Sequence, residues 1–271
     1  MSEVVLSIFP INNFDSNVEL LRLDGKTRLR HPDNGEFQNV KEKFSEHRGA
    51  LEVAFLNVNY VVETKIRLDE TGEAWEKLPH VDNILLALRL LKVGDVNISF
   101  AFLVDSKDRI FGIKVPSISD IFFRNPYFLK KEEATSFVKL WKKLLKVKDE
   151  KPHLRFPLTQ FNKAFEKRAS GMDGDEIVDC MVALESLVFY GENKSIEPAG
   201  KVMGVAIGML LGNNEKERNK IKKTLTKAYE VRNAKVHGNM DKLKKYQKDI
   251  GRLSVEVEDY LRLTLRRFVE E

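Results

Sequence analysis

The spacing of apolar residues changes near Lys130, and this change constrains the fold more than any other feature of the chain. Before Lys130, apolar residues alternate with others, as in half-buried strands, over Leu51–Val62, Val96–Val104 and Ile110–Val115. Between these segments, Val81–Leu91 is rich in Leu and Ala and predicts a helix that ends near Gly94. We therefore predict an α+β domain over residues 1–128.

After Lys130 the apolar residues follow the period of an α-helix. The predicted helices are Ala134–Leu145, Thr159–Arg168, Asp175–Tyr190, Pro198–Gly212, Glu215–His237 and Asp241–Val269, the last with a break near Gly251. Lys146–Pro157 is charged and contains two prolines, which predicts a loop. Since no strand pattern follows Lys130, we expect residues 129–271 to form an all-α bundle. An apolar stripe should face its core, at Ile177, Met181, Leu184 and Val188.

Composition narrows the class of protein further. The 271 residues are 42% hydrophobic and 32% charged, which is typical of a globular protein and argues against a membrane protein. The longest apolar run, Val202–Leu211, is too short to span a bilayer and contains two glycines. Met1–Val5 lacks the basic segment of a secretory signal, so we expect a cytoplasmic protein without a membrane partner. Cys180 is the only cysteine and is expected to be buried on a helix.

The charge is distributed unevenly. From Lys151 onward there are 23 Lys and Arg against 18 Asp and Glu, which accounts for the whole net charge of +5. This imbalance suggests an anionic partner for the C-terminal half. The other histidines, His31, His47, His80 and His153, show no metal-ligand spacing, and we expect neither a metal nor a cofactor.

The segment Arg232–Gly238 combines a permanent cation with a titratable imidazole near a helix end. An Arg fork fits a phosphate, and a His transfers protons near neutral pH, so the pair contains the parts for metal-free RNA cleavage. Five residues along a helix correspond to a rise of roughly 7.5 Å and a rotation of about 140°, so Arg232 and His237 should not share a face. They converge only if the helix unwinds at its end or a partner supplies part of the site. Gly238 favours a helix end at this point.

Tyr229–Gly238 resembles the signature of the HEPN superfamily, in which an Arg, a polar residue, a short spacer and a His lie near the end of a late helix. Upstream, Asp179–Val188 resembles the Ala-Leu-Glu-x-Leu helix of the Apea-like HEPN group, and Lys201–Leu211 stands where that group has a helix of small residues. The resemblance covers roughly the last half of the chain. The segment Asn83–Leu90 is faintly similar to the module that precedes such domains in Apea-type defence proteins, which implies a sensor or regulatory role for residues 1–128.

This resemblance implies a homodimeric, metal-independent endoribonuclease of the defence or toxin type, in which two Arg-His motifs form one cleft. Arg232 would clamp the phosphate, His237 would transfer the proton, and Asn233 would orient the phosphate or the His. Glu185 matches the acidic position of the earlier helix, where it would contact RNA or position Arg232 through a salt bridge. RNA is the expected partner, together with a regulatory partner or trigger at the N-terminal domain.

Two other interpretations stay open. In one, the C-terminal half is a non-catalytic HEPN module that binds RNA, a nucleotide or a protein partner without cutting. Alternatively, the chain is a helical adaptor in which Arg232 and His237 only cap a helix, since Arg and His are common in a last helical turn. The run Lys242, Lys244, Lys245 and Lys248 is expected to be a solvated face rather than a dedicated RNA groove.

Overall fold

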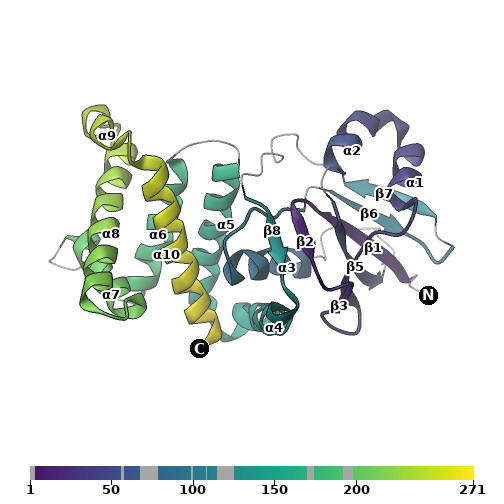
Figure 1. Cartoon of the computed structure of the whole chain (residues 1–271), viewed down its shortest axis with the longest axis horizontal. Helices are drawn as coiled ribbons and strands as arrows, with labels where there is room; N and C mark the ends of the chain where they lie inside the picture. The colour runs from purple at the N-terminus through teal and green to yellow at the C-terminus, as the bar shows by residue number, and fades with distance from the viewer. Residues whose placement is uncertain are drawn as a thin grey trace. The chain divides into compact units, whose positions relative to one another are not determined.

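The computed structural model describes residues 4–55, 58–67, 79–98, 100–107, 109–114, 125–169, 174–191 and 198–271 (Figure 1). The chain divides into two compact units, Met1–Lys142 and Lys143–Glu271. The boundary between them falls within one helix, α4 (Ala134–Glu150). The expected sequence of an α+β region followed by a helical region is confirmed at this level.

An antiparallel sheet organises the N-terminal unit. Its strands are β1 (Val4–Ile11), β3 (Leu20–Arg22), β4 (Thr27–Arg30), β5 (Tyr60–Arg67), β6 (Ala101–Val104) and β7 (Ile110–Lys114), in the spatial order β3-β4-β5-β1-β6-β7. A separate parallel pair joins β2 (Phe14–Ser16) to β8 (Tyr127–Leu129). The Tyr127 hydroxyl donates a hydrogen bond of 2.8 Å to the Leu88 carbonyl, which ties β8 to α3 (Pro79–Leu91).

The central strand β1 contains a proline, which normally confines a segment to a sheet edge. Here β1 pairs with β5 along its whole length but with β6 only from Leu6 to Ile8. Pro10 lies opposite Val61 of β5 and beyond the stretch that pairs with β6. The missing N–H of Pro10 therefore costs no hydrogen bond to β6, and a central strand tolerates it.

Two short helices pack on one face of this sheet. They are α1 (Glu36–Lys43) and α2 (Arg48–Ala54), and a 3₁₀ turn, Ser45–His47, connects them. Val40, Leu51 and Ala54 from these helices form one apolar cluster with Ile8 and Phe102 of the sheet. This cluster is the core on that face.

The predicted strand Leu51–Val62 is wrong in its first half. Arg48–Ala54 is a helix, and the strand begins only at Tyr60. Leu51 and Ala54 are three residues apart and both are buried, which is helical spacing within a sequence that also alternates. The predicted strands at Val96–Val104 and Ile110–Val115 are confirmed in part, as β6 and β7, and the helix Val81–Leu91 is confirmed as α3.

The C-terminal unit is helical, and no strand occurs among its described residues. Its helices are α5 (Arg155–Ala169), α6 (Asp175–Val188), α7 (Ala199–Leu211), α8 (Glu215–Val236), α9 (Met240–Tyr246) and α10 (Ile250–Glu270). Helix α6 contacts α5, α7, α8 and α10, so it lies at the centre of the unit (Figure 1). Ile177, Met181 and Leu184 are fully buried, as predicted, while Val188 is half-buried. Cys180 is buried as well.

One predicted loop is wrong, and one predicted break is confirmed. The loop expected over Lys146–Pro157 is mostly helical, because α4 continues to Glu150, a 3₁₀ turn covers Pro152–Leu154, and α5 begins at Arg155. Both prolines occupy first-turn positions, where the missing N–H would have no partner in the helix. The predicted break near Gly251 is confirmed: it falls at residues 247–249, and Gly251 itself lies in the first turn of α10.

Helix α7 packs unusually closely on α8. Glycines recur every four residues along α7 and its C-terminus, at Gly200, Gly204, Gly208 and Gly212. A Cβ atom on Gly204 would lie 3.0 Å from the Cα of Lys222, and one on Gly200 would lie 2.7 Å from the Cβ of Tyr229. These positions have no room for a larger side chain, so the glycine row sets how near the two helices approach.

Candidate functional site

The end of α8 forms at the predicted residue. Gly238 has a φ of +66°, in the left-handed region, and its N–H donates to the Lys235 carbonyl at 3.2 Å. The Asn239 N–H donates to the Ala234 carbonyl at 2.8 Å, and this pair of bonds is a Schellman motif. The Asn239 side chain then caps α9 by accepting from the Lys242 N–H at 3.1 Å. The helix end predicted at Gly238 is confirmed.

Three of the predicted site residues meet between α6 and α8. One terminal nitrogen of Arg232, Nη2, lies 3.2 Å from Glu185 Oε2, and the other, Nη1, donates to Asn233 Oδ1 at 2.9 Å. The side chains of Arg232 and Glu185 are 21% and 22% exposed, so the ion pair is largely but not wholly shielded. Of the two roles that the sequence left open for Glu185, the salt bridge to Arg232 is present.

Tyr229 belongs to the same cluster, and sequence reasoning did not single it out. The Arg232 guanidinium lies over the Tyr229 ring, 5.6 Å from its centroid. Burial raises the pKa of Tyr229, and the negative charge and hydrogen bonding of Glu185 raise it further, while Arg232 and Asn233 act in the opposite direction. Tyr229 lies three residues before Arg232, a spacing that places both on neighbouring parts of one helix face, and this was the available signal.

The donors of Arg232 are only partly used. A guanidinium has five N–H groups. Nη1 and Nη2 each donate one hydrogen bond, so each retains one N–H. Nε is enclosed and finds no acceptor in the part of the chain that the structure describes. The arrangement therefore leaves two terminal donors on Arg232 that a bound acceptor would satisfy.

His237 lies apart from this cluster. Helix α8 stays regular to Val236, and His237 is its C-cap residue, with an exposed side chain. Its backbone N–H donates to the Asn233 carbonyl at 3.0 Å, but within the described ranges its ring forms no hydrogen bond or ion pair with Glu185, Arg232 or Asn233. Since α8 does not unwind before His237, unwinding does not bring the His toward the Arg.

A basic surface runs along the outer side of α8. Lys222, Lys223 and Lys227 line a hollow of about 330 Å³, together with Asn219, Thr226 and Glu230. Lys227 also pairs with Asp249 at 2.5 Å and lies 5.4 Å from the centroid of the Tyr246 ring. The lining residues carry three positive charges and one negative charge, so the hollow favours an anionic ligand.

Among the residues that the structure describes, no group of three or more His, Cys, Asp and Glu side chains is arranged to hold a metal ion. Within the same ranges, none of the helices combines the length and the apolar character that a membrane crossing requires. Comparisons of the chain with protein-family models, curated proteins and solved structures find no match.

Proposed function

We propose that the C-terminal unit is a HEPN-like domain that cleaves RNA without a metal, as a homodimer of the defence or toxin type. The observation that carries the proposal is the way Arg232 is held. Glu185, Asn233 and Tyr229 fix its guanidinium, while one N–H on each terminal nitrogen stays available. Two such donors on one planar group match two oxygens of a phosphodiester.

The chemistry uses the nucleophile that RNA itself carries. His237 removes or relays the proton of the 2′-OH, and this oxygen attacks the adjacent phosphorus. Arg232 offsets the charge that grows on the phosphorane oxygens. The P–O5′ bond breaks, the leaving oxygen takes up a proton, and the products end in a 2′,3′-cyclic phosphate and a 5′-OH. A positioned acid–base group contributes about 10²–10⁴-fold.

A second copy of the chain would bring a His237 side chain close to Arg232. His237 does not meet Arg232 of its own chain through any described contact, so a composite site from two chains would bring the two groups together. Val236 and Met240, on either side of His237, are 54% and 62% exposed. Apolar surface around the His favours a protein contact at this end of α8.

The first experiment compares cleavage of total RNA, in EDTA, by the wild type, Arg232→Ala, His237→Ala and the control His153→Ala. The wild type and His153→Ala should cut, and the other two variants should not. The ends of the products, identified by mass spectrometry, should be 2′,3′-cyclic phosphates. Equal cutting by the wild type and His237→Ala would reject the site, and cutting that requires a metal would reject the mechanism.

Mixing the two inactive variants tests the composite site. If Arg232 of one chain works with His237 of the other, mixed dimers of Arg232→Ala and His237→Ala contain one intact site. After random exchange of subunits about a quarter of the wild-type sites are then restored. No recovery, in a mixture shown by mass spectrometry to contain mixed dimers, would place the working Arg and His in the same chain.

A non-catalytic HEPN module is the second candidate, and the Arg232–Glu185 ion pair favours it. The Glu185 carboxylate occupies one donor of Arg232, and its negative charge weakens the electrostatic attraction between Arg232 and a phosphate. This candidate predicts RNA binding that weakens with salt, without cleavage. Loss of binding in Arg232→Ala, with no cutting by the wild type, would support it over the nuclease.

A further inference from the structure

A buried polar network crosses the sheet of the N-terminal unit. Glu63 of β5 accepts hydrogen bonds from Arg28 Nε at 2.8 Å and Arg28 Nη2 at 2.9 Å, and from Arg30 Nε at 2.7 Å. Glu63 is only 3% exposed. Burial opposes its charged form, but the hydrogen bonds and charges of the two arginines outweigh burial and lower the pKa of Glu63. The carboxylate is therefore ionised and fully occupied.

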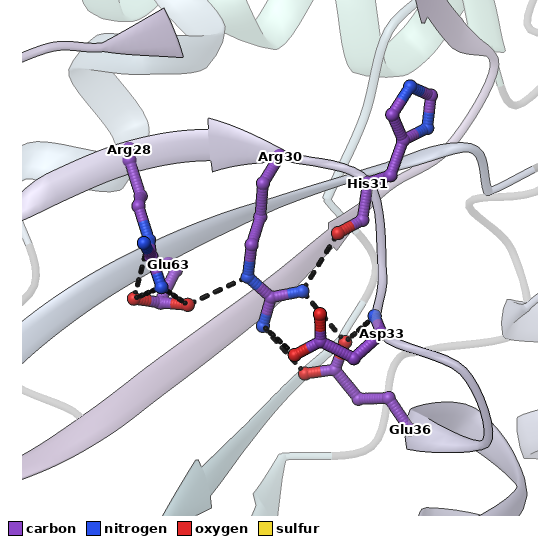
Figure 2. A network of polar contacts seen from close by, with 6 residues as sticks. All are labelled: Arg28, Arg30, His31, Asp33, Glu36 and Glu63. Carbon is purple, nitrogen blue, oxygen red and sulfur yellow. Dashed lines mark hydrogen bonds and ion pairs between the residues drawn. The ribbon is translucent and has the colours of Figure 1, made fainter. Parts of the chain in front are cut away.

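Arg30 extends this network to α1, and its side chain donates hydrogen bonds to acceptors on both sides. It lies between Glu63 and Glu36, as Figure 2 shows. Its terminal nitrogens donate to the two oxygens of Glu36 at 2.9 and 3.0 Å and to the His31 carbonyl at 2.8 Å. Burial alone would lower the pKa of Arg30, but these carboxylates raise it. Arg30 thus fastens the first turn of α1 to the sheet.

Arg28 is held by a carboxylate on one edge of its guanidinium only. It uses Nε and one N–H of Nη2 to bind Glu63, and its side chain is 41% exposed. Both N–H groups of Nη1 and the second N–H of Nη2 have no acceptor within the described residues. These hydrogens form the outer edge of the guanidinium, which is the edge that binds a carboxylate with two parallel hydrogen bonds.

Arg28 lines a cavity of about 260 Å³ beside α1, on the sheet face where α1 and α2 pack. Five apolar residues of the sheet line its floor, Leu6, Ile8, Phe102, Val104 and Ile110. Ile8, Phe102 and Val104 are already buried in the core cluster, so Leu6 and Ile110 supply most of the accessible apolar surface. Leu6 and Ile110 are only partly buried, so a ligand on this floor would remove further apolar surface from water. The exposed amides of Asn34 and Asn39 stand at the rim.

We propose that this cavity binds a small monocarboxylate with an apolar body, the class that includes short fatty acids and aryl acids. The body would rest on the floor, and the carboxylate would bind the outer edge of Arg28. The lining carries two arginines against Asp33, Glu36 and Glu63, a net charge of −1, so an anion is attracted only by the unused donors of Arg28, and a second negative charge, as on a phosphate, adds further repulsion. A cation is disfavoured because the oxygens of Glu36 and Glu63 are already taken by arginines. This proposal does not depend on the proposed nuclease.

The test uses the full-length protein and three probes of one shape. They are 2-naphthoate, 2-naphthalenemethanol and 2-naphthylmethylamine, with binding measured by ligand-observed NMR and isothermal titration calorimetry. The acid should bind best and the amine worst. A second series, butyrate, hexanoate and octanoate, should bind more tightly as the chain lengthens, because each added methylene covers more of the floor.

Variants locate the site. Arg28→Met should weaken naphthoate binding about tenfold or more, because a charge-assisted pair of hydrogen bonds is lost while Glu63 keeps Arg30 as its partner. The control is Arg22→Met, because Arg22 lies directly opposite Arg28 in the sheet, is exposed, and does not line the cavity. Val104→Trp should abolish binding by filling the cavity, and circular dichroism checks that each variant is folded. Absence of binding by every acid, equal binding by Arg28→Met and the wild type, or preference for the amine would each overturn the proposal.

Discussion

Arg232 and Glu185 are separated by 47 residues in the chain, yet their side chains meet at 3.2 Å between the central helix α6 and the long helix α8. Asn233 and Tyr229 complete the surroundings of the guanidinium. Glu185 is therefore a positioning residue, because it acts on Arg232.

Replacing Glu185 with Gln should lower the free energy of unfolding by about 1–2 kcal/mol, because the ion pair becomes a hydrogen bond from the charged guanidinium to a neutral amide in a largely shielded place. Urea unfolding measures the loss. The control is Glu270→Gln, which removes the partner of Arg266 in a more exposed pair of 3.0 Å and should cost less than about 0.5 kcal/mol. Equal losses in the two variants would mean that Glu185 holds Arg232 no better than a surface pair.

The same substitution should change the ionisation of Tyr229. The pKa of Tyr229 is raised above its ordinary value of 10.0 by burial first and by Glu185 second. In Glu185→Gln burial persists but the charge is gone, so the pKa of Tyr229 should fall relative to the wild type. NMR of protein labelled at tyrosine Cζ resolves the ring, and Tyr229→Phe assigns its signal. An unchanged pKa would show that Glu185 does not contact the hydroxyl.

Gly204→Ala should destabilise the C-terminal unit by about 1–3 kcal/mol, because the new methyl would overlap the backbone of Lys222. Thermal and urea unfolding measure this. Gly251→Ala is the matched control, since Gly251 lies in α10 with nothing within 4 Å of an added Cβ. It should stabilise by up to about 1 kcal/mol through the better helix propensity of Ala. A stable Gly204→Ala protein would mean that α7 and α8 have room to separate.

Glu63→Gln should remove a stabilisation that depends on pH. The folded pKa of Glu63 lies below its ordinary value of 4.5, so its contribution is fully present above that pH and is lost as the pH falls through the folded pKa. The difference in unfolding free energy between wild type and variant should be about 3 kcal/mol at pH 7 and should shrink below about pH 4.5. A difference that does not vary between pH 7 and pH 3 would contradict the ion pairs with Arg28 and Arg30.

The helices of the C-terminal unit were predictable because their signals are local. Apolar spacing and the stop residues Gly191, Gly212 and Gly238 lie within or beside the segments that they define. The N-terminal strands were less accessible, because β1 (Val4–Ile11) depends on partners more than 45 residues away and contains Pro10. Leu51–Val62 was assigned wrongly because a short apolar run fits either period.

The site divides in the same way. Sequence reasoning found Arg232 and Glu185 and allowed a salt bridge between them, and it recognised the offset between Arg232 and His237. It gave Tyr229 no role, because the spacing from Arg232 alone does not show the surroundings of the side chain. The Tyr229 hydroxyl interacts with Glu185 of α6, and its ring packs on Gly200 of α7. The network of Arg28, Arg30 and Glu63 was equally hidden, since a charged residue in a strand gives no sign that its partner lies opposite in the next strand.

The glycine row of α7 also restricts how α7 could slide along α8. Any gradual slide of α7 along α8 would press a larger side chain into the space that only a glycine fits. The permitted displacement is one whole step of four residues, about 6 Å along the axis. Tyr229 packs on Gly200, the first glycine of this row. Because the Tyr229 ring also lies under the Arg232 guanidinium, a displacement of α7 along α8 would disturb the surroundings of Arg232 as well.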